Sequence, residues 1–258
     1  MAAGGAARMI TDIADWLSNS ANWHGADGIP ARLLEHLQYS VIALLIAMVV
    51  ALPLGLLIGH TGKGTFVVVF IANAFRALPT IGLVILFVIQ ISPHIHGRGD
   101  AAYLIPTEIA LVLLAIPPML SNAYAGVQSI DPAVRDAAQG MGMVSRQVMF
   151  GVELPCALPL ILSGIRSATL QVIATATIGA YVSLGGFGRY IFDGQSQHDY
   201  PQMASGALLV AVLALLVDLT LSVVQRFVVS RGISSRYSPA TSVNEPARLA
   251  FADASNQE

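Results

Sequence analysis

The sequence predicts an all-α, polytopic membrane protein that crosses the bilayer five times. Of its 258 residues, 55% are hydrophobic and only 11% are charged, whereas soluble domains carry about 25% charged residues. Five apolar runs are each long enough to cross a bilayer as a helix, for which roughly 20 residues are needed. Short polar stretches separate these runs, so the apolar residues belong to separate spans rather than to one globular core.

Charge and cysteine content exclude several classes of function. A net charge of −2 leaves no large basic surface for nucleic acid. With one cysteine, Cys156, the chain forms no internal disulfide, and no cluster of cysteine and histidine residues has the spacing of metal ligands. The first thirty residues lack a basic start followed by an apolar core, so we expect no signal peptide and insertion directed by the first span.

The five spans differ in the prolines that they contain. Pro79 should bend the second span, because proline removes a helical hydrogen bond, and the Pro117-Pro118 pair should break the third. A tight polar turn at residues 60–64 joins the first two spans. The predicted spans are residues 37–58, 65–91, 103–127, 161–184 and 203–229.

The segments outside the spans set the orientation that we expect. Residues 1–35 are polar and mildly amphipathic, and their two tryptophans suit the headgroup layer, although a partly ordered tail without a specific role is an equal alternative. Residues 230–258 are rich in Ser, Ala, Pro and Asn, which predicts a disordered tail. Lysine and arginine number seven on one face and four on the other, which places residues 128–160 and the C-terminus in the cytoplasm and the N-terminus outside.

The segment of residues 128–160 carries the most specific pattern. Asp131 followed by Pro132 is typical of a helix start, with an acidic N-cap and a proline in the first helical position. Gly140 and Gly142 should end this helix. Its apolar face consists of mostly small residues at helical spacing, which are Ala133, Val134, Ala137, Ala138 and Met141.

A second helical stretch should follow, because Val144, Val148 and Val152 are spaced four apart. We expect Pro155 and Pro159 to stop it before the next span begins. The whole segment therefore predicts a short helix-turn-helix on the cytoplasmic face, with small side chains that let another protein's backbone approach closely. The alternative is a loop helix that packs on its own bundle.

This segment resembles the signature of ABC importer permeases: Glu-Ala-Ala, three residues, Gly, nine residues, an aliphatic residue, one residue and Leu-Pro. The matching positions are Asp136, Ala137, Ala138, Gly142, Val152, Leu154 and Pro155. Asp136 stands where glutamate is usual, which keeps the charge and shortens the reach of the side chain. The resemblance implies that this helix docks in a groove of an ATPase subunit and transmits the ATP-driven closure of the ATPases to the spans.

The resemblance extends over residues 36–229 and is greatest to the permeases of osmoprotectant importers, which move glycine betaine, carnitine, choline or related quaternary amines. It implies the five-span transmembrane domain of a type I ABC importer. Methionine-importer permeases share this layout, so a permease for methionine or another small zwitterion is the alternative. The supporting motifs are Asp131-Pro132-Ala133, Gly140-Met141-Gly142-Met143, Gly164-Ile165-Arg166-Ser167-Ala168-Thr169, Ala174-Thr175-Ala176-Thr177 and Gly185-Gly186-Phe187-Gly188.

The same resemblance implies the partners of the chain. These are a second permease subunit, identical or paralogous, two cytoplasmic ATPase subunits, an extracytoplasmic solute-binding protein and the lipid of a bacterial inner membrane. No cofactor is expected in this chain, because ATP and Mg²⁺ would bind to the ATPase. The Gly62-Lys63-Gly64 stretch is not a phosphate loop, since that motif requires Ser or Thr directly after the lysine and a glycine where Leu57 stands.

Polar and charged residues inside the spans point to a path and an ion pair. A charge at the bilayer centre costs roughly 2.5–3.5 kcal/mol on insertion scales, so Arg76 and Asp218 should face the protein interior and have partners. Arg166 lies at a similar depth to Asp218, and we expect the two to pair, either to hold helices together or to gate. Residues that could line a substrate path, or equally form hydrogen bonds between helices, are Asn73, Pro79, Tyr124, Gln171, Thr175 and Thr177.

Two other classes of membrane protein compete with this interpretation. A channel or structural protein would not need the coupling signature, and no filter-like loop is visible in the sequence. An intramembrane enzyme would need a nucleophile and a base in facing spans, but all six histidines fall outside the membrane centre. We therefore predict a translocation subunit that is not itself an enzyme.

Overall fold

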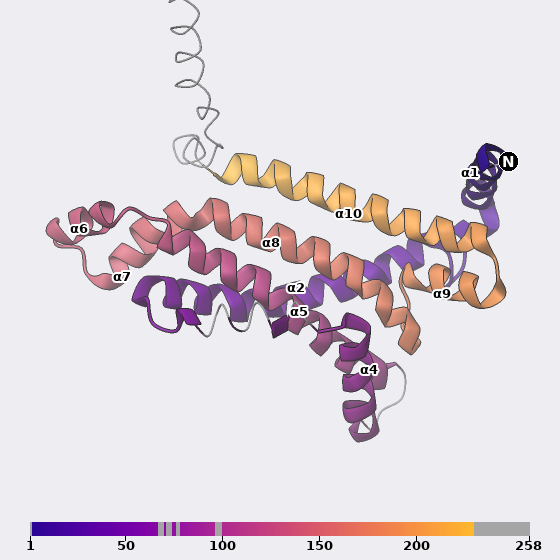
Figure 1. Ribbon diagram of the computed structural model, residues 1–258, viewed down its shortest axis with the longest axis horizontal. Helices are drawn as coiled ribbons and strands as arrows, with labels where there is room; N and C mark the ends of the chain where they lie inside the picture. The colour runs from indigo at the N-terminus through magenta and orange to yellow at the C-terminus, as the bar shows by residue number, and fades with distance from the viewer. Residues whose placement is uncertain (1, 67–69, 71–73, 76–77, 96–99, 230–258) are drawn as a thin grey trace, which may run out of the picture.

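The chain folds into an elongated bundle of helices, seen in the computed structural model of Figure 1. The structure describes residues 2–66, 70, 74–75, 78–95 and 100–229, and within these ranges it contains helices and turns but no β-strand. The long helices lie side by side along one axis. The prediction of an all-α, polytopic membrane protein is confirmed.

Four helical runs in the described part of the chain are long and apolar enough to cross a membrane. Two of them are α2 (Ile29–Thr61) and α5 (Ala101–Gln128). The third is the continuous run Ser145–Val182, and the fourth is α10 (Tyr200–Val228). Each overlaps a predicted span, although α2 begins eight residues before the predicted residue 37 and the Ser145–Val182 run begins sixteen residues before the predicted residue 161.

The second predicted span, residues 65–91, is described only in part. Its described portion includes α4 (Thr80–Ile91), which Pro79 precedes as the N-cap residue. At 12 residues, α4 rises about 18 Å, less than the roughly 30 Å thickness of a hydrocarbon core. Figure 1 shows α4 turned across the direction of the long helices. Asn73 and Arg76 lie outside the described residues, so a fifth span stays a prediction.

Small residues bring α2 and α5 close together. Ala43, Ala47 and Ala51 repeat every four residues along one face of α2 and are completely buried. Gly55 and Gly59 continue the same face, and a Cβ at either position would lie 2.7 Å from a Cβ of α5. Helices in lipid associate largely through such close van der Waals packing, because burial of apolar surface gives little advantage there. This seam joins a core to which α8 (Leu154–Ala176) also contributes, through Ala168, Val172 and Ala176.

The outer faces of the long helices remain apolar and exposed in the single chain. The buried residues of α10 are Ser205, Gly206 and Leu213. The other leucines of this helix are exposed or half-buried. Leu215, Leu219 and Phe227 are each more than half exposed. Such a surface suits lipid or a second subunit rather than water.

Two of the interruptions expected at prolines do not occur. The helix α5 runs through Pro117 and Pro118 without interruption, so the prediction that they break the third span is wrong. Both prolines are buried among neighbouring helices, and the carbonyl of Pro118 accepts a hydrogen bond of 2.8 Å from the side-chain amide of Asn122. This bond does not replace the one that each proline removes, which would end on a carbonyl four residues earlier. Membrane helices tolerate prolines because packing on neighbouring helices offsets the lost backbone bonds.

Pro155 and Pro159 also fail to stop the helix before them. The short α7 (Ser145–Val148) continues through a π-helical stretch, Met149–Glu153, directly into α8. The N–H of Leu154 donates to the carbonyl of Met149, five residues back, and this wider turn precedes Pro155 in the first turn of α8. A π-helical turn shifts the hydrogen-bond register locally, so the chain continues through the proline.

The bundle ends in different structures at its two ends. At one end lie α6 (Pro132–Gly140) and α7, here called the coupling end (Figure 1). At the opposite end lie α1 (Ala2–Ser18), a 3-10 turn at residues 20–23 and α9 (Gly188–Gln197). The polar stretch between the predicted spans 161–184 and 203–229 thus contains a helix, α9. The predicted boundary between residues 35 and 36 falls inside α2.

Candidate functional site

The helix α6 at the coupling end has the boundaries that the sequence predicts. Asp131 caps its start, since Oδ1 accepts a 2.9 Å hydrogen bond from the N–H of Ala133. At its end, the N–H of Met143 donates to the carbonyl of Ala138 at 3.2 Å, and Gly142 has a φ of +86°. This left-handed glycine termination closes the helix and satisfies a terminal carbonyl. A Cβ at Gly142 would meet nothing within 4 Å. Glycine is therefore favoured here by the backbone conformation and not by a lack of space.

The apolar face of α6 is mostly uncovered. Ala138 is buried, but Ala133 and Ala137 are exposed and Met141 has 77% of its surface exposed. The following residues repeat this pattern, with Val144 at 62% and Phe150 at 52% exposed. A loop helix that packed on its own bundle would bury these side chains. The exposure therefore favours a surface on which another protein docks.

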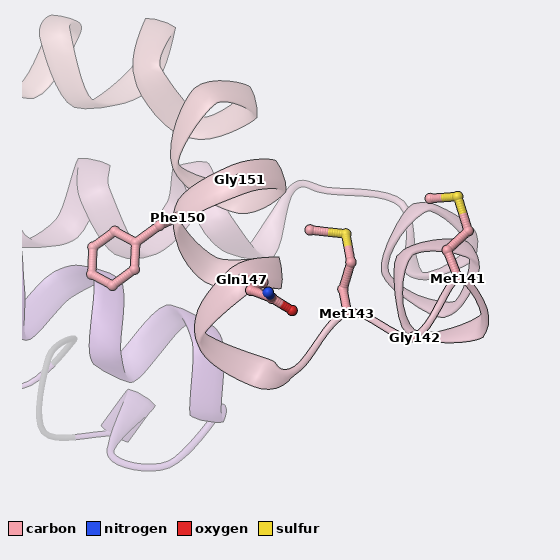
Figure 2. A pocket seen from close by; sticks show the side chains of 6 residues that line it. All are labelled: Met141, Gly142, Met143, Gln147, Phe150 and Gly151. Carbon is pink, nitrogen blue, oxygen red and sulfur yellow. The ribbon is translucent and has the colours of Figure 1, made fainter.

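A hollow of about 630 Å³ opens between the end of α6 and the helical run that follows it. Figure 2 shows Met141, Gly142 and Met143 on one side of it and Gln147, Phe150 and Gly151 on the other. The side-chain carbonyl of Gln147 accepts a hydrogen bond of 2.9 Å from the N–H of Val144, which fixes the intervening turn. Methionine and aromatic side chains adapt readily to a partner surface.

A buried carboxylate fastens this segment to the bundle. Glu153 is only 1% exposed. Its Oε2 lies 2.6 Å from Nδ1 of His60 at the end of α2, and its Oε1 lies 2.8 Å from Nε of Arg135 on α6. The other ring nitrogen of His60 lies 2.7 Å from the hydroxyl of Ser145. We call these four residues the Glu153 cluster.

The Glu153 cluster also reaches α5. Nη2 of Arg135 donates to the carbonyl of Val127 at 2.6 Å, and the amide of Gln128 donates to the carbonyl of Gly59 at 2.7 Å. A buried carboxylate is tolerated when it is paired and hydrogen-bonded. The cluster therefore connects α6 and the start of the Ser145–Val182 run to the ends of α2 and α5.

The sequence prediction missed this cluster, although one signal was present. Glu153 stands between Val152 and Leu154 of the signature, and an acidic residue in an apolar run calls for a cation near it. The partner His60 is 93 residues away in the chain, so no local pattern indicates it.

The structure divides the signature residues between two places. Asp136, Ala137 and Gly142 are exposed on α6 and the turn that follows, with Ala138 buried beneath them. Val152 and Leu154 are half-buried in the continuous helix, and Pro155 is exposed. The first group is accessible to a partner. The second group lies in the helical run that continues into the span.

The predicted path residues do not form a single site. Gln171 lines a small cavity of about 70 Å³ with Ser167, Pro117 and Pro118 among others. The hydroxyls of Thr175 and Thr177 donate to carbonyls of their own helix, those of Gln171 and Ala174, at 2.8 and 2.7 Å.

Tyr124 lies elsewhere, with its hydroxyl 3.3 Å from that of Thr65 at the coupling end. Pro79 precedes α4, and Asn73 lies outside the described residues. Along α8, however, Ser163, Ser167 and Gln171 are exposed and spaced four apart, which makes a polar stripe on one face of a span.

Arg166 and Asp218 lie together between α8 and α10. Both guanidinium Nε and Nη2 of Arg166 donate to the carboxylate of Asp218, the second at 2.6 Å. This is the bidentate geometry that arginine forms with carboxylates. The pair links these two long helices, and the sequence prediction placed the two residues correctly.

Polar contacts also tie the opposite end together. Oε2 of Glu35 accepts from the N–H of Gly186 at 2.8 Å and from Arg32 at 2.9 Å. Tyr190 of α9 donates its hydroxyl to the carbonyl of Asp27 at 2.6 Å, and burial raises the pKa of Tyr190 to about 12. The ring of Trp16 on α1 packs edge-on against that of Tyr190 at 5.1 Å, so α1 is docked on the bundle.

Comparisons with known proteins agree with the sequence resemblance. Residues 51–232 match the family described as "Binding-protein-dependent transport system inner membrane component". The chain is 31% identical to the glycine betaine/carnitine/choline transport system permease protein OpuCB of Bacillus subtilis, across 77% of this chain and 88% of that protein. It is likewise 31% identical to the osmoprotectant import permease protein OsmW of Salmonella typhimurium, across 77% of this chain and 91% of that protein.

Among solved structures, the inward-facing MetNI methionine ABC transporter contains a chain of similar fold. The two superpose with a TM-score of 0.67 over 78% of this chain and 96% of that one, at 21% sequence identity. At this identity the likeness concerns the fold alone.

Proposed function

Because the chain belongs to the family of binding-protein-dependent transport system inner membrane components and is a permease subunit of an ABC importer, we propose that its solute is an osmoprotectant. Relatives named for glycine betaine, carnitine and choline support this solute class, at about 31% identity over most of both chains. The methionine transporter chain is similar in fold but only 21% identical, so a methionine permease is the second candidate.

The observation that carries the mechanism is the exposed apolar face of α6. We propose that this face, with the adjacent hollow at Met141 and Phe150, docks on a cytoplasmic ATPase subunit. When ATP closes the ATPase pair, α6 moves with it. The Glu153 cluster then transmits this displacement to α2, α5 and the Ser145–Val182 run. ATP and Mg²⁺ belong to the ATPase, and the permease itself breaks no covalent bond.

The polar stripe on α8 supports an assembly of two permease subunits, identical or paralogous. Ser163, Ser167 and Gln171 are exposed in the single chain, and polar side chains in a span face other protein or a water-filled path rather than lipid. Facing stripes from two subunits would border the path, with Thr175 and Thr177 further along the same run.

The expected orientation follows from the coupling end. Docking of α6 on two ATPases requires that end to be cytoplasmic, so the N-terminus lies outside the inner membrane of a bacterium. The solute-binding protein would then approach the end formed by α1, α9 and the 183–187 turn. Arg189 and Asp193 form a half-buried ion pair of 3.0 Å there, which is partly accessible to such a partner.

Uptake by the complete complex tests the solute. The permease, its ATPase and its binding protein are reconstituted in vesicles, and ATP-dependent uptake of labelled glycine betaine, carnitine, choline and methionine is compared. We expect uptake of one or more of the three quaternary amines and none of methionine. Uptake of methionine alone would overturn the osmoprotectant assignment while leaving the permease assignment intact.

A further inference from the structure

A second hollow lies on the surface between α2 and α5, away from the coupling end. It has a volume of about 450 Å³, within the range of about 300–1,000 Å³ typical of ligand pockets. Ile42 and Ile46 of α2 face Ile105, Ile109 and Val112 of α5 across it. One ionisable side chain, Glu108, shares this aliphatic lining.

Glu108 is a buried acid that has no hydrogen-bond partner within the described part of the chain. It is only 9% exposed, and neither carboxyl oxygen has a hydrogen-bond partner among the residues that the structure describes. It lies seven residues into α5, about 10 Å along the helix from its first residue and about 30 Å from Gln128 at the coupling end. An ionisable group at such a depth in a span is expensive, and its usual reason is function.

The lining restricts the kind of cation that fits. Arginine carries five N–H donors and lysine three, and the side chains of the described residues that line the hollow offer no acceptor besides the two oxygens of Glu108. An arginine or lysine of another subunit would therefore leave buried donors unsatisfied. A quaternary ammonium group has no N–H donor. Its methyl groups suit contact with isoleucine and valine side chains, and its charge needs only one carboxylate nearby.

We propose that Glu108 and the aliphatic groove around it bind the quaternary ammonium group of the transported solute, at a site separate from the path that the α8 stripes would border. This inference rests on the proposed osmoprotectant function and assigns part of its recognition to one residue. It also predicts a preference, because choline is a cation whereas glycine betaine carries its own carboxylate. That carboxylate would be repelled by Glu108, so choline gains more from Glu108 than glycine betaine does.

The test is choline uptake by the complete complex with Glu108→Gln, in vesicles of phosphatidylethanolamine and phosphatidylglycerol. We expect choline uptake at low concentration to fall by about tenfold or more, glycine betaine uptake to fall clearly less, and the choline-to-betaine ratio to change. Glu108→Asp keeps the charge and should retain most choline uptake. Asp12→Asn removes an equal charge from the exposed face of α1 and serves as the matched control.

Several outcomes would overturn the proposal. Equal loss for both solutes, no loss for either, or failure of Glu108→Gln and Glu108→Asp alike to co-purify with the ATPase would assign Glu108 a structural role. Phosphatidylcholine carries the same headgroup chemistry, so a dependence on Glu108 seen only in vesicles that contain this lipid would assign the groove to lipid. A wild-type complex that moves methionine alone would instead reject the proposed function itself, before any variant is compared.

Discussion

Glu153 and Glu108 are both glutamates of long helical runs, and both are buried, with 1% and 9% of their surface exposed. Their surroundings differ completely. Glu153 lies 2.6 Å from His60 and 2.8 Å from Arg135, and its cluster joins three long helical runs. Glu108 has aliphatic neighbours and no hydrogen-bond partner in the described part of the chain.

This difference separates two uses of a buried carboxylate. A carboxylate that is paired inside the protein fixes the relative positions of the elements that supply its partners. Removal of one partner leaves a buried charge without compensation, which destabilises the protein. An unpaired carboxylate contributes no such fixation, and its charge becomes favourable only when a cation arrives. The coupling end therefore needs Glu153 for its architecture, whereas the surroundings of Glu108 fit its proposed role in binding the solute.

The largest expected effect comes from Glu153→Gln. Loss of this charge leaves Arg135 and His60 near a neutral amide in a buried position, which should destabilise the permease by about 3–5 kcal/mol. The matched substitution Glu108→Gln removes an uncompensated charge and should change stability by no more than about 0.5 kcal/mol, or increase it. Thermal unfolding of the two purified variants in the same detergent measures this contrast.

Equal destabilisation of the two variants would show that Glu153 and Glu108 do not differ in their structural role. A loss confined to Glu108→Gln would reverse it, and would place the structural carboxylate in the α2–α5 groove. Co-purification with the ATPase, measured on the same samples, reports whether Glu153→Gln also releases the coupling segment.

A second test takes the Glu153 cluster apart in pairs. Arg135→Gln alone leaves Glu153 buried beside His60 only, whereas Arg135→Gln combined with Glu153→Gln leaves no carboxylate in the cluster. The double variant should therefore be more stable than the sum of the two single losses, with a coupling energy of about 1–3 kcal/mol. A double-mutant cycle in chemical denaturation supplies the value, and additive losses would show that the 2.8 Å contact contributes nothing.

The sequence predicts those features that depend on neighbouring residues. The Asp131-Pro132 start and the Gly142 end of α6 are local, and the structure contains both. The pair of Arg166 and Asp218 was predictable because depth in the membrane follows from helical rise alone. Glu108 is likewise an ionisable residue inside a predicted span, that of residues 103–127. The sequence does not indicate which residues surround it.

Features that depend on distant residues were not predictable in this way. The continuity of the helix through Pro117-Pro118 accompanies the burial of both prolines against neighbouring helices, which the local sequence does not indicate. The passage through Pro155 depends on a π-helical turn whose register no apolar spacing indicates. The contact between Glu153 and His60 joins residues 93 apart in sequence, and only the packing of α2 on the Ser145–Val182 run brings them together.

A smaller effect on stability, with a large one on transport, is expected at Gly142. Its φ of +86° penalises any side chain by at most about 1–2 kcal/mol, and the open space around it avoids a clash within the permease. Gly142→Asp should therefore insert and unfold almost as the wild type does, but lose ATPase binding and solute uptake. Gly142→Asn, of similar size and without charge, separates the effect of charge from that of bulk at the docking surface. Unimpaired uptake by Gly142→Asp would count against the docking of this turn.

The smallest effect is expected at Asp131, which closes the first turn of α6 with one 2.9 Å hydrogen bond. Asp131→Ala should cost about 1 kcal/mol of helix stability, whereas Asp131→Asn retains an N-cap acceptor and should cost only a fraction of that. Because α6 projects from the bundle, this loss should fray the helix locally and leave the global unfolding transition in place. Hydrogen exchange of residues 132–140 is the appropriate measurement: faster exchange confined to α6 in Asp131→Ala would match the expectation. Faster exchange that extended to α2 and α5 would mean that the coupling segment stabilises the bundle, rather than being held by the Glu153 cluster.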